Sequence, residues 1–154
     1  MKKVLKLVAV MLVAVFIAIQ FFRPSFSNPA IVPGQPIEES MNVSADVQMV
    51  LSRSCNDCHS NKSVYPWYSH IAPASWFLAD HIDAGRRDLN FSEWGSYTPD
   101  RKAHKLEEIC EMIESGSMPL PSYLWIHRGA ALEPSQRKLL CDWAASERNN
   151  LGIE

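Results

Sequence analysis

The sequence predicts an all-α fold. Apolar residues recur three and four positions apart in several separate stretches, which is the spacing of a helix with one buried face. Prolines and glycines separate these stretches, as they do between helices. No stretch of useful length alternates apolar with polar residues in the manner of a strand, and no internal repeat is visible. We therefore expect a small helical domain.

The composition indicates one compact domain with an extension. The chain has 154 residues, of which 47% are hydrophobic, and its five tryptophans help to supply a hydrophobic core. The formal net charge is −2, but four of the 15 basic residues precede residue 27 and all 17 acidic residues follow it. The rest of the chain is therefore acidic, which argues against nucleic-acid binding, because that function needs a basic face.

The first segment, residues 1–22, has the pattern of an export signal or membrane anchor. Three lysines in its first six residues precede an apolar run that only Gln20 interrupts. No cleavage site with small residues follows, so we expect an uncleaved anchor close to the ~20 residues that span a bilayer. Removal of the segment as a signal peptide is the alternative. In both cases we expect the rest of the chain on the extracytoplasmic side of the cell membrane.

Residues 23–43 are expected to form an extended linker. Their prolines (Pro24, Pro29, Pro33 and Pro36) disfavour a helix and favour an extended chain. The folded domain is then expected to occupy residues 44–154.

Four helices are expected within this domain. The first runs from the N-cap Ser44 to Ser54, and the second begins with Ser75 as its cap. The third begins at Thr98-Pro99 and ends before Gly116, and the fourth runs from Pro134 to about Arg148. Their expected buried faces comprise Val47, Val50 and Leu51; Trp76, Leu78 and Ile82; Leu106, Ile109, Cys110 and Ile113; and Leu139, Leu140, Trp143 and Ala144. Loops rich in aromatic residues are expected at 60–74, 88–97 and 120–133.

The sequence Cys55-Asn56-Asp57-Cys58-His59 is the attachment motif of c-type haem. Cys55 and Cys58 are placed to form thioethers to one haem, and His59 to supply the proximal axial nitrogen. A thioredoxin-like redox motif would need a βαβ context, which is missing. A zinc site would need a second pair of ligands, for which Cys110 and Cys141 are the candidates.

Met118 is the expected distal axial ligand. It follows Gly116 in a loop after a helix and precedes Pro119, which favours an extended loop. A methionine that fills a gap in the core is the alternative. The other histidines (His70, His81, His104 and His127) are rivals, of which His104 is discounted because it falls on the polar side of its helix, while His127 is the best placed.

Two further pairs of residues leave alternatives open. Cys110 and Cys141 lie on the apolar faces of two helices, so they form either a disulfide in an oxidising compartment or two buried thiols. Arg86 and Arg87 lie near the end of a helix, where they suit the helix dipole. They pair with haem propionates or lie solvated at the surface.

Several motifs together resemble the haem-binding domain family of bacterial exported, cytochrome-c-like proteins. They are Cys55-Asn56-Asp57-Cys58-His59-Ser60-Asn61, Tyr65-Pro66-Trp67-Tyr68, Ile71-Ala72-Pro73-Ala74-Ser75-Trp76, Asn90-Phe91-Ser92-Glu93-Trp94 and Met118-Pro119-Leu120. The resemblance extends from about Ser44 to Glu147. It implies one covalent haem c and a small cytochrome-c-like helical domain around it, and it implies no particular physiological role.

The expected function is that of a membrane-anchored mono-haem c-type cytochrome. His59 and Met118 as axial ligands would leave the iron no free site for substrate, so one-electron transfer with redox partner proteins is expected. No catalytic residue is assigned. The alternative is a haem-based peroxidase or small-ligand sensor with an open sixth iron site, in which His70 or Arg86 would be the distal polar group.

Overall fold

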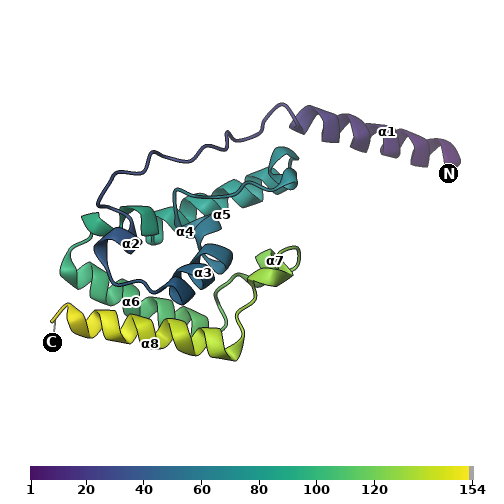
Figure 1. Cartoon of the computed structure of the whole chain (residues 1–154). Helices are drawn as coiled ribbons and strands as arrows, with labels where there is room; N and C mark the ends of the chain where they lie inside the picture. Colours follow the sequence, from purple (N-terminus) through teal and green to yellow (C-terminus); the bar gives the residue numbers. More distant parts are fainter. Residues whose placement is uncertain (153–154) are drawn as a thin grey trace.

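The computed structural model describes residues 1–152, and these fold into helices without a strand, which confirms the all-α prediction. Figure 1 shows the arrangement of the elements. The α-helices are α1 (Lys2–Ile19), α2 (Ile37–Ser40), α3 (Ala45–Ser54), α4 (Asn56–His59), α5 (Ala74–Asp88), α6 (Pro99–Glu114), α7 (Pro121–Leu124) and α8 (Pro134–Asn150). Short 3-10 helices, η1 (Trp67–His70), η2 (Phe91–Ser96) and η3 (Arg128–Ala130), interrupt the loops.

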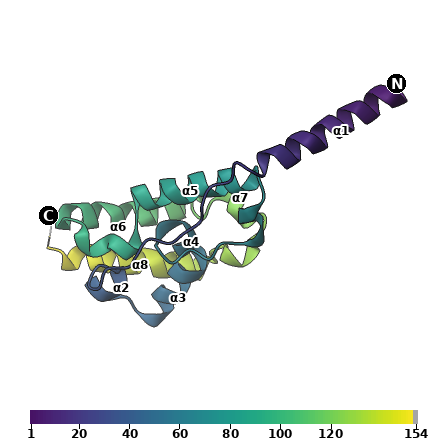
Figure 2. The same cartoon turned by 90° about the horizontal axis from the view of Figure 1, so that it is seen from above.

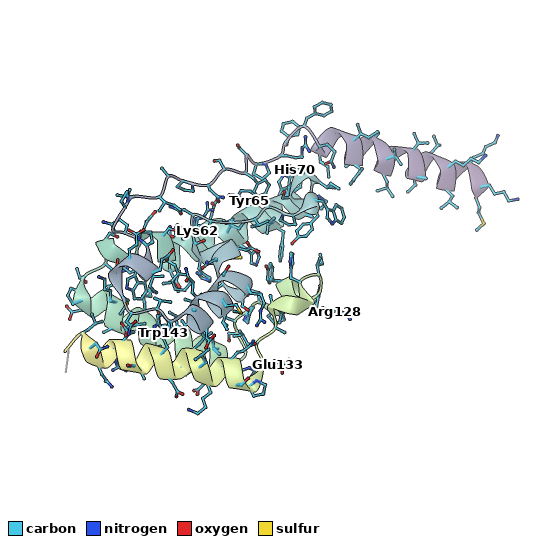
Figure 3. The ribbon with its side chains drawn as sticks, viewed as in Figure 1. Lys62, Tyr65, His70, Arg128, Glu133 and Trp143 are labelled. Carbon is cyan, nitrogen blue, oxygen red and sulfur yellow. A yellow bond between two sulfur atoms is a disulfide. The ribbon has the colours of Figure 1, made fainter. Side chains whose placement is uncertain are left out.

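Helices α6 and α8 lie side by side and antiparallel, and a disulfide joins them (Figure 1). The disulfide links Cys110 to Cys141, whose Cα atoms are 4.9 Å apart, so the sequence alternative of two free thiols is wrong for this pair. Trp143 of α8 is buried, and its Nε1 donates to the Asn42 carbonyl oxygen at 3.0 Å (Figure 3). The core of the domain also contains buried side chains of α6 and α8, namely Leu106, Ile109, Ile113, Leu140 and Ala144.

The ends of α6 are those that the sequence predicts. The Thr98 hydroxyl accepts from the Arg101 backbone N–H at 3.3 Å, and Pro99 occupies the first helical position, where its missing N–H is harmless. Gly116 follows the C-cap with φ of +71°, a left-handed conformation that favours glycine. The helix therefore ends at Glu114, and three residues separate its end from Met118.

Helix α3 confirms the first predicted helix and leads directly into the C-x-x-C-H motif. The Ser44 hydroxyl accepts from the Val47 backbone N–H at 3.4 Å, and Val47, Val50 and Leu51 are buried against the core. Cys55 is both the C-cap of α3 and the N-cap of α4. The motif is thus a single helical turn held at the end of a packed helix.

The start of α5 differs from the prediction. Helix α5 begins at Ala74 with Pro73 at the N-cap, so Ser75 lies inside the helix rather than at its cap. The Ser75 backbone N–H donates to the Ile71 carbonyl oxygen at 2.9 Å, and its hydroxyl is buried without a hydrogen-bond partner in the described structure. The helix therefore begins two residues earlier than it would with Ser75 as its cap.

The proline-rich segment is irregular only in its first part. Residues 23–32 have no regular structure, but α2 follows, and Pro36 and Ile37 are buried in the core. The Gly95 backbone N–H donates to the Gln35 carbonyl oxygen at 2.7 Å. The C-terminal part of the segment therefore packs against η2, because Ile37 removes apolar surface from water there.

Helix α1 projects from the domain, and none of its residues is buried (Figures 1 and 2). Within residues 1–152, no helix combines the length and the apolar character needed to cross a membrane, so the membrane-spanning anchor predicted at 1–22 is not supported. Three lysines occupy the first turns of this 18-residue helix, which shortens its apolar part below the ~20 residues of a span.

Candidate functional site

The two cysteines of the C-x-x-C-H turn are free thiols, in contrast to the disulfide-bonded pair on α6 and α8. Burial, and secondly the neighbouring Cys58, raises the pKa of Cys55 to about 12. Burial, and secondly Asp57, raises the pKa of Cys58 to about 11. Both groups are therefore uncharged near neutral pH, as half-buried thiols in an apolar setting are.

The imidazole of His59 is fixed by two backbone carbonyl groups at the C-terminal end of α5, those of Gly85 and of the C-cap Leu89. Its Nδ1 lies 3.1 Å from the Leu89 carbonyl oxygen and 3.2 Å from the Gly85 carbonyl oxygen. Since both partners only accept, Nδ1 carries the proton and the lone pair is on Nε2. Burial lowers the pKa of His59, which keeps the ring neutral. A neutral imidazole held in one tautomer through its other nitrogen is the usual form of a metal-ligating histidine.

Helix α5 reaches His59 because Gly85 allows it to approach the motif closely. A Cβ atom at position 85 would lie 2.7 Å from the Cys58 carbonyl oxygen, which is closer than Cβ atoms approach other heavy atoms in proteins. The close approach brings the carbonyl groups of Gly85 and Leu89 within hydrogen-bonding reach of the imidazole.

Two adjoining cavities of about 150 and 270 Å³ surround this turn. Both are lined by Cys55, His59 and Met118, and Cys58 lines the larger one. The structure therefore brings together the four residues that the sequence proposes as thioether donors and axial ligands. The loop of Met118 is attached to α6, where the Met118 backbone N–H donates to the Met112 carbonyl oxygen at 3.0 Å.

The walls of the cavities are mainly apolar, with one buried cation at the edge. The apolar lining of the smaller cavity comprises Leu51, Phe91, Ile109, Ile113 and Leu132. Lys105 also lines it and donates to Asp88 at 2.9 Å and to Glu108 at 2.6 Å. Burial lowers the pKa of Lys105, but the hydrogen bonds to Glu108 and Asp88 outweigh it, so the net direction is upward. The i,i+3 spacing of Lys105 and Glu108 was the only sequence signal for this pair.

Among the rival histidines, only His81 lines a cavity of the site. It lies on the wall of the larger cavity, and its Nδ1 is 2.7 Å from the Phe77 carbonyl oxygen. His104 is exposed and lies 3.3 Å from Glu108, as its place on the polar side of α6 predicts. His127 is 2.8 Å from the Tyr68 hydroxyl, outside both cavities. His70 is exposed near the start of the linker, where the Arg23 guanidinium donates to its carbonyl oxygen, and it lines neither cavity (Figure 3).

Arg86 is occupied in holding the loop after the motif. Its guanidinium donates to the Ser60 carbonyl oxygen at 2.9 Å, to the Ser63 hydroxyl at 2.9 Å and to Asn28 at 2.7 Å. It lines neither cavity, so the predictions that it is a distal polar group or a propionate partner find no support in this geometry.

Tyr123 of α7 is a polar residue of the larger cavity that sequence reasoning missed. Its hydroxyl donates to Asp57 at 2.7 Å. Burial, followed by this hydrogen bond, raises the pKa of Tyr123. No local pattern marks Tyr123, because Tyr123 and Asp57 are 66 positions apart in the sequence and meet only in the folded chain.

The donor set fits a haem and does not fit zinc. Two free thiols, a neutral imidazole with a free Nε2 and a thioether line one apolar region. The sulfur atoms of Cys110 and Cys141, with a carboxylate oxygen of Glu114, lie within 4.8 Å of one another, but the disulfide removes both thiolates that zinc would need.

Comparison with known proteins agrees with this fit. No curated protein and no solved structure matches the chain. The family model described as the haem-binding domain matches residues 14–146, which is most of the chain and includes every residue of the site. The donor set of the site fits haem, the cofactor for which this family is named. The chain therefore belongs to the haem-binding domain family.

Proposed function

We propose that the protein is a mono-haem c-type cytochrome that carries single electrons between redox partner proteins. Cys55 and Cys58 would hold the haem through thioethers, and His59 and Met118 would be its axial ligands. The observation that carries the proposal is the hydrogen bonding of His59, whose Nδ1 is held by Gly85 and Leu89 so that Nε2 is left to ligate. The bound haem iron supplies the one-electron redox chemistry.

The protein's own residues would keep the site rigid and dry. The two carbonyl groups at the C-terminal end of α5 hold the His59 ring in one orientation, and the mainly apolar walls disfavour water. The hydrogen bond from the Met118 backbone N–H to Met112 holds the distal loop near the end of α6. A thioether is a poor donor to ferric iron, so Met118 as sixth ligand would raise the reduction potential.

We further propose that the domain lies on the extracytoplasmic side of a bacterial cell membrane and is attached to it through α1. The helix is mainly apolar and has no buried residue, and lysines occupy its first turns, which supports contact with lipid. The disulfide between Cys110 and Cys141 supports an oxidising compartment.

A denaturing gel and an optical spectrum of the purified full chain test the proposal. We expect haem to stay on the chain in a denaturing gel, and to be lost from the Cys55→Ser, Cys58→Ser double variant. We expect the ferric protein to show a methionine-to-iron charge-transfer band that Met118→Ala abolishes while lowering the potential. Met112→Ala is the matched control, since Met112 lines the smaller cavity without entering the proposed ligand set. An unchanged band in Met118→Ala would exclude Met118 as ligand.

A second function, small-ligand binding or peroxidase chemistry at an open sixth site, is favoured by one observation. His81 and Tyr123 line the same cavity as Met118, so polar side chains are available on the wall of this cavity. Carbon monoxide separates the two functions. A six-coordinate ferrous protein should bind it slowly, and Met118→Ala should bind it fast. Rapid binding by the unmodified protein would favour the open site.

A further inference from the structure

Exposed apolar side chains gather at the end of the domain where α1 joins it. We call them the aromatic face, which consists of Phe21, Phe22, Trp67, Ile71, Trp76, Phe77, Trp125 and Ile126. Their exposed fractions range from 38% to 83%. Figures 1 and 2 agree that the end of α1, the start of α5 and α7 lie at the same end of the molecule. A group of exposed apolar side chains of this size commonly marks an interaction site.

Contacts connect the three segments that contribute to the face. The rings of Trp67 and Tyr68 meet at 5.8 Å, and the Tyr68 hydroxyl is 2.8 Å from Nε2 of His127, just after α7. The Trp76 Nε1 donates to the Phe22 carbonyl oxygen at 2.5 Å. The segments after α1, before α5 and at α7 are therefore tied to one another.

The end of α1 is attached to this same face. The Gln20 side chain donates to the Ala72 carbonyl oxygen and accepts from the Ala72 backbone N–H, each at 3.0 Å. This reciprocal pair fixes the last turn of α1 next to η1 and α5. A membrane or protein that contacts the C-terminal end of α1 is therefore also close to the aromatic face.

The three segments that form the face carry no acidic residue. Residues 20–26, 66–77 and 120–130 contain no Asp or Glu, although the chain has 17 of them. The same segments contain Arg23 and Arg128, together with His70 and His127. Figure 3 shows Arg128 at the edge of the molecule beside α7. Segments that combine aromatic and apolar side chains with cations and contain no acid match the chemistry of a bilayer surface with anionic headgroups.

We propose that the aromatic face docks on the surface of a phospholipid bilayer that contains anionic lipids. Trp67, Trp76 and Trp125 have the amphipathic indole ring that is enriched at the headgroup level of membranes. This inference rests on the proposed membrane attachment through α1 and adds the orientation of the domain. It places α7, and with it the larger cavity that Tyr123 lines, next to the membrane.

Photolabelling of the full-length holoprotein tests the docking. The protein is reconstituted into vesicles of phosphatidylethanolamine and phosphatidylglycerol that contain a phospholipid with a diazirine near its headgroup. Adducts are mapped by peptide mass spectrometry. We expect adducts on α1, on residues 66–77 and on residues 121–127. We expect none on α3, whose Met49 is 67% exposed but does not belong to the aromatic face.

The outcomes separate this inference from the attachment on which it rests. Adducts on α1 without adducts on 66–77 and 121–127 would overturn the docking and leave the attachment intact. Adducts on the face without adducts on α1 would support the docking and overturn attachment through α1. Absence from both would overturn both. Protein–protein crosslinks through the face in place of lipid adducts would show a second copy or another protein as its occupant, and would overturn the docking.

Matched variants give a second measurement. In the Trp67→Gln, Trp125→Gln double variant, we expect the adduct yield on residues 71–77 to fall roughly fivefold, because two indole rings leave the interface. Both side chains are more than 70% exposed, so the fold is expected to persist. Met49→Gln is the control and should leave the yield unchanged. An unchanged yield in the double variant would also overturn the docking.

Discussion

Gly85 of α5 and Cys58 of the C-x-x-C-H turn lie so close together that a Cβ atom on Gly85 would be 2.7 Å from the Cys58 carbonyl oxygen. This contact sets the distance between α5 and the motif. The carbonyl groups that orient His59 come from Gly85 itself and from Leu89, one turn later. The packing of one helix residue thus governs the geometry of the proposed proximal ligand.

Gly85→Ala should therefore weaken the domain at the site. The added methyl group would push α5 from the motif turn, and overpacking of this kind costs about 1–3 kcal/mol of the free energy of unfolding. We expect a lower urea midpoint and less haem per chain. Gly129→Ala is the control, because nothing lies within 4 Å of a Cβ atom there. Equal stability of the two variants would show that α5 can yield without cost.

Arg86 should contribute to stability rather than to the redox properties of the haem. Its guanidinium holds Ser60 and Ser63 after the motif, and loss of such charged hydrogen bonds costs about 1.5–3 kcal/mol. Arg86→Met should lower the free energy of unfolding, while exposed Arg87→Met should not. A large change in reduction potential with unchanged stability would instead make Arg86 a propionate partner.

The disulfide should be a major source of stability. It links Cys110 to Cys141, which are 31 positions apart in the sequence, and such crosslinks contribute about 2–4 kcal/mol. Urea unfolding with and without dithiothreitol should differ by this amount. In the Cys110→Ala, Cys141→Ala double variant, the reductant should have no effect on the urea midpoint. A reductant effect that persists in this variant would show that another group responds.

Tyr123 should make stability fall at alkaline pH. The pKa of its folded-state hydroxyl lies above that of an unfolded tyrosine, so its contribution is fully present below pH ~10 and decreases as pH rises above that value. Tyr123→Phe should cost about 1 kcal/mol at pH 7, from the lost hydrogen bond to Asp57, and should show a smaller alkaline decrease. Parallel curves of unfolding free energy against pH would contradict this assignment.

Local sequence patterns predicted the elements whose ends depend on nearby residues. Thr98-Pro99 and Gly116 bound α6, since a cap, a fixed φ and a left-handed glycine act within one turn. Ser75 misled the prediction of α5, because its hydroxyl is buried and the turn that starts the helix uses the carbonyl group of Ile71. No local pattern predicted the burial of Ile37 in the core, because α2 packs against η2, which is distant in the sequence.

By itself, the sequence determined that the chain is helical and where the haem motif lies, because helical periodicity and a five-residue attachment motif are local properties. Only the tertiary structure decided which nitrogen of His59 is free, since the carbonyl groups that hold Nδ1 are 26 and 30 residues away. The same holds for the pairing of Cys110 with Cys141 and for the arrival of His81 and Tyr123 at the cavity. These contacts depend on how packed helices meet, and burial of apolar surface across the whole domain determines that arrangement.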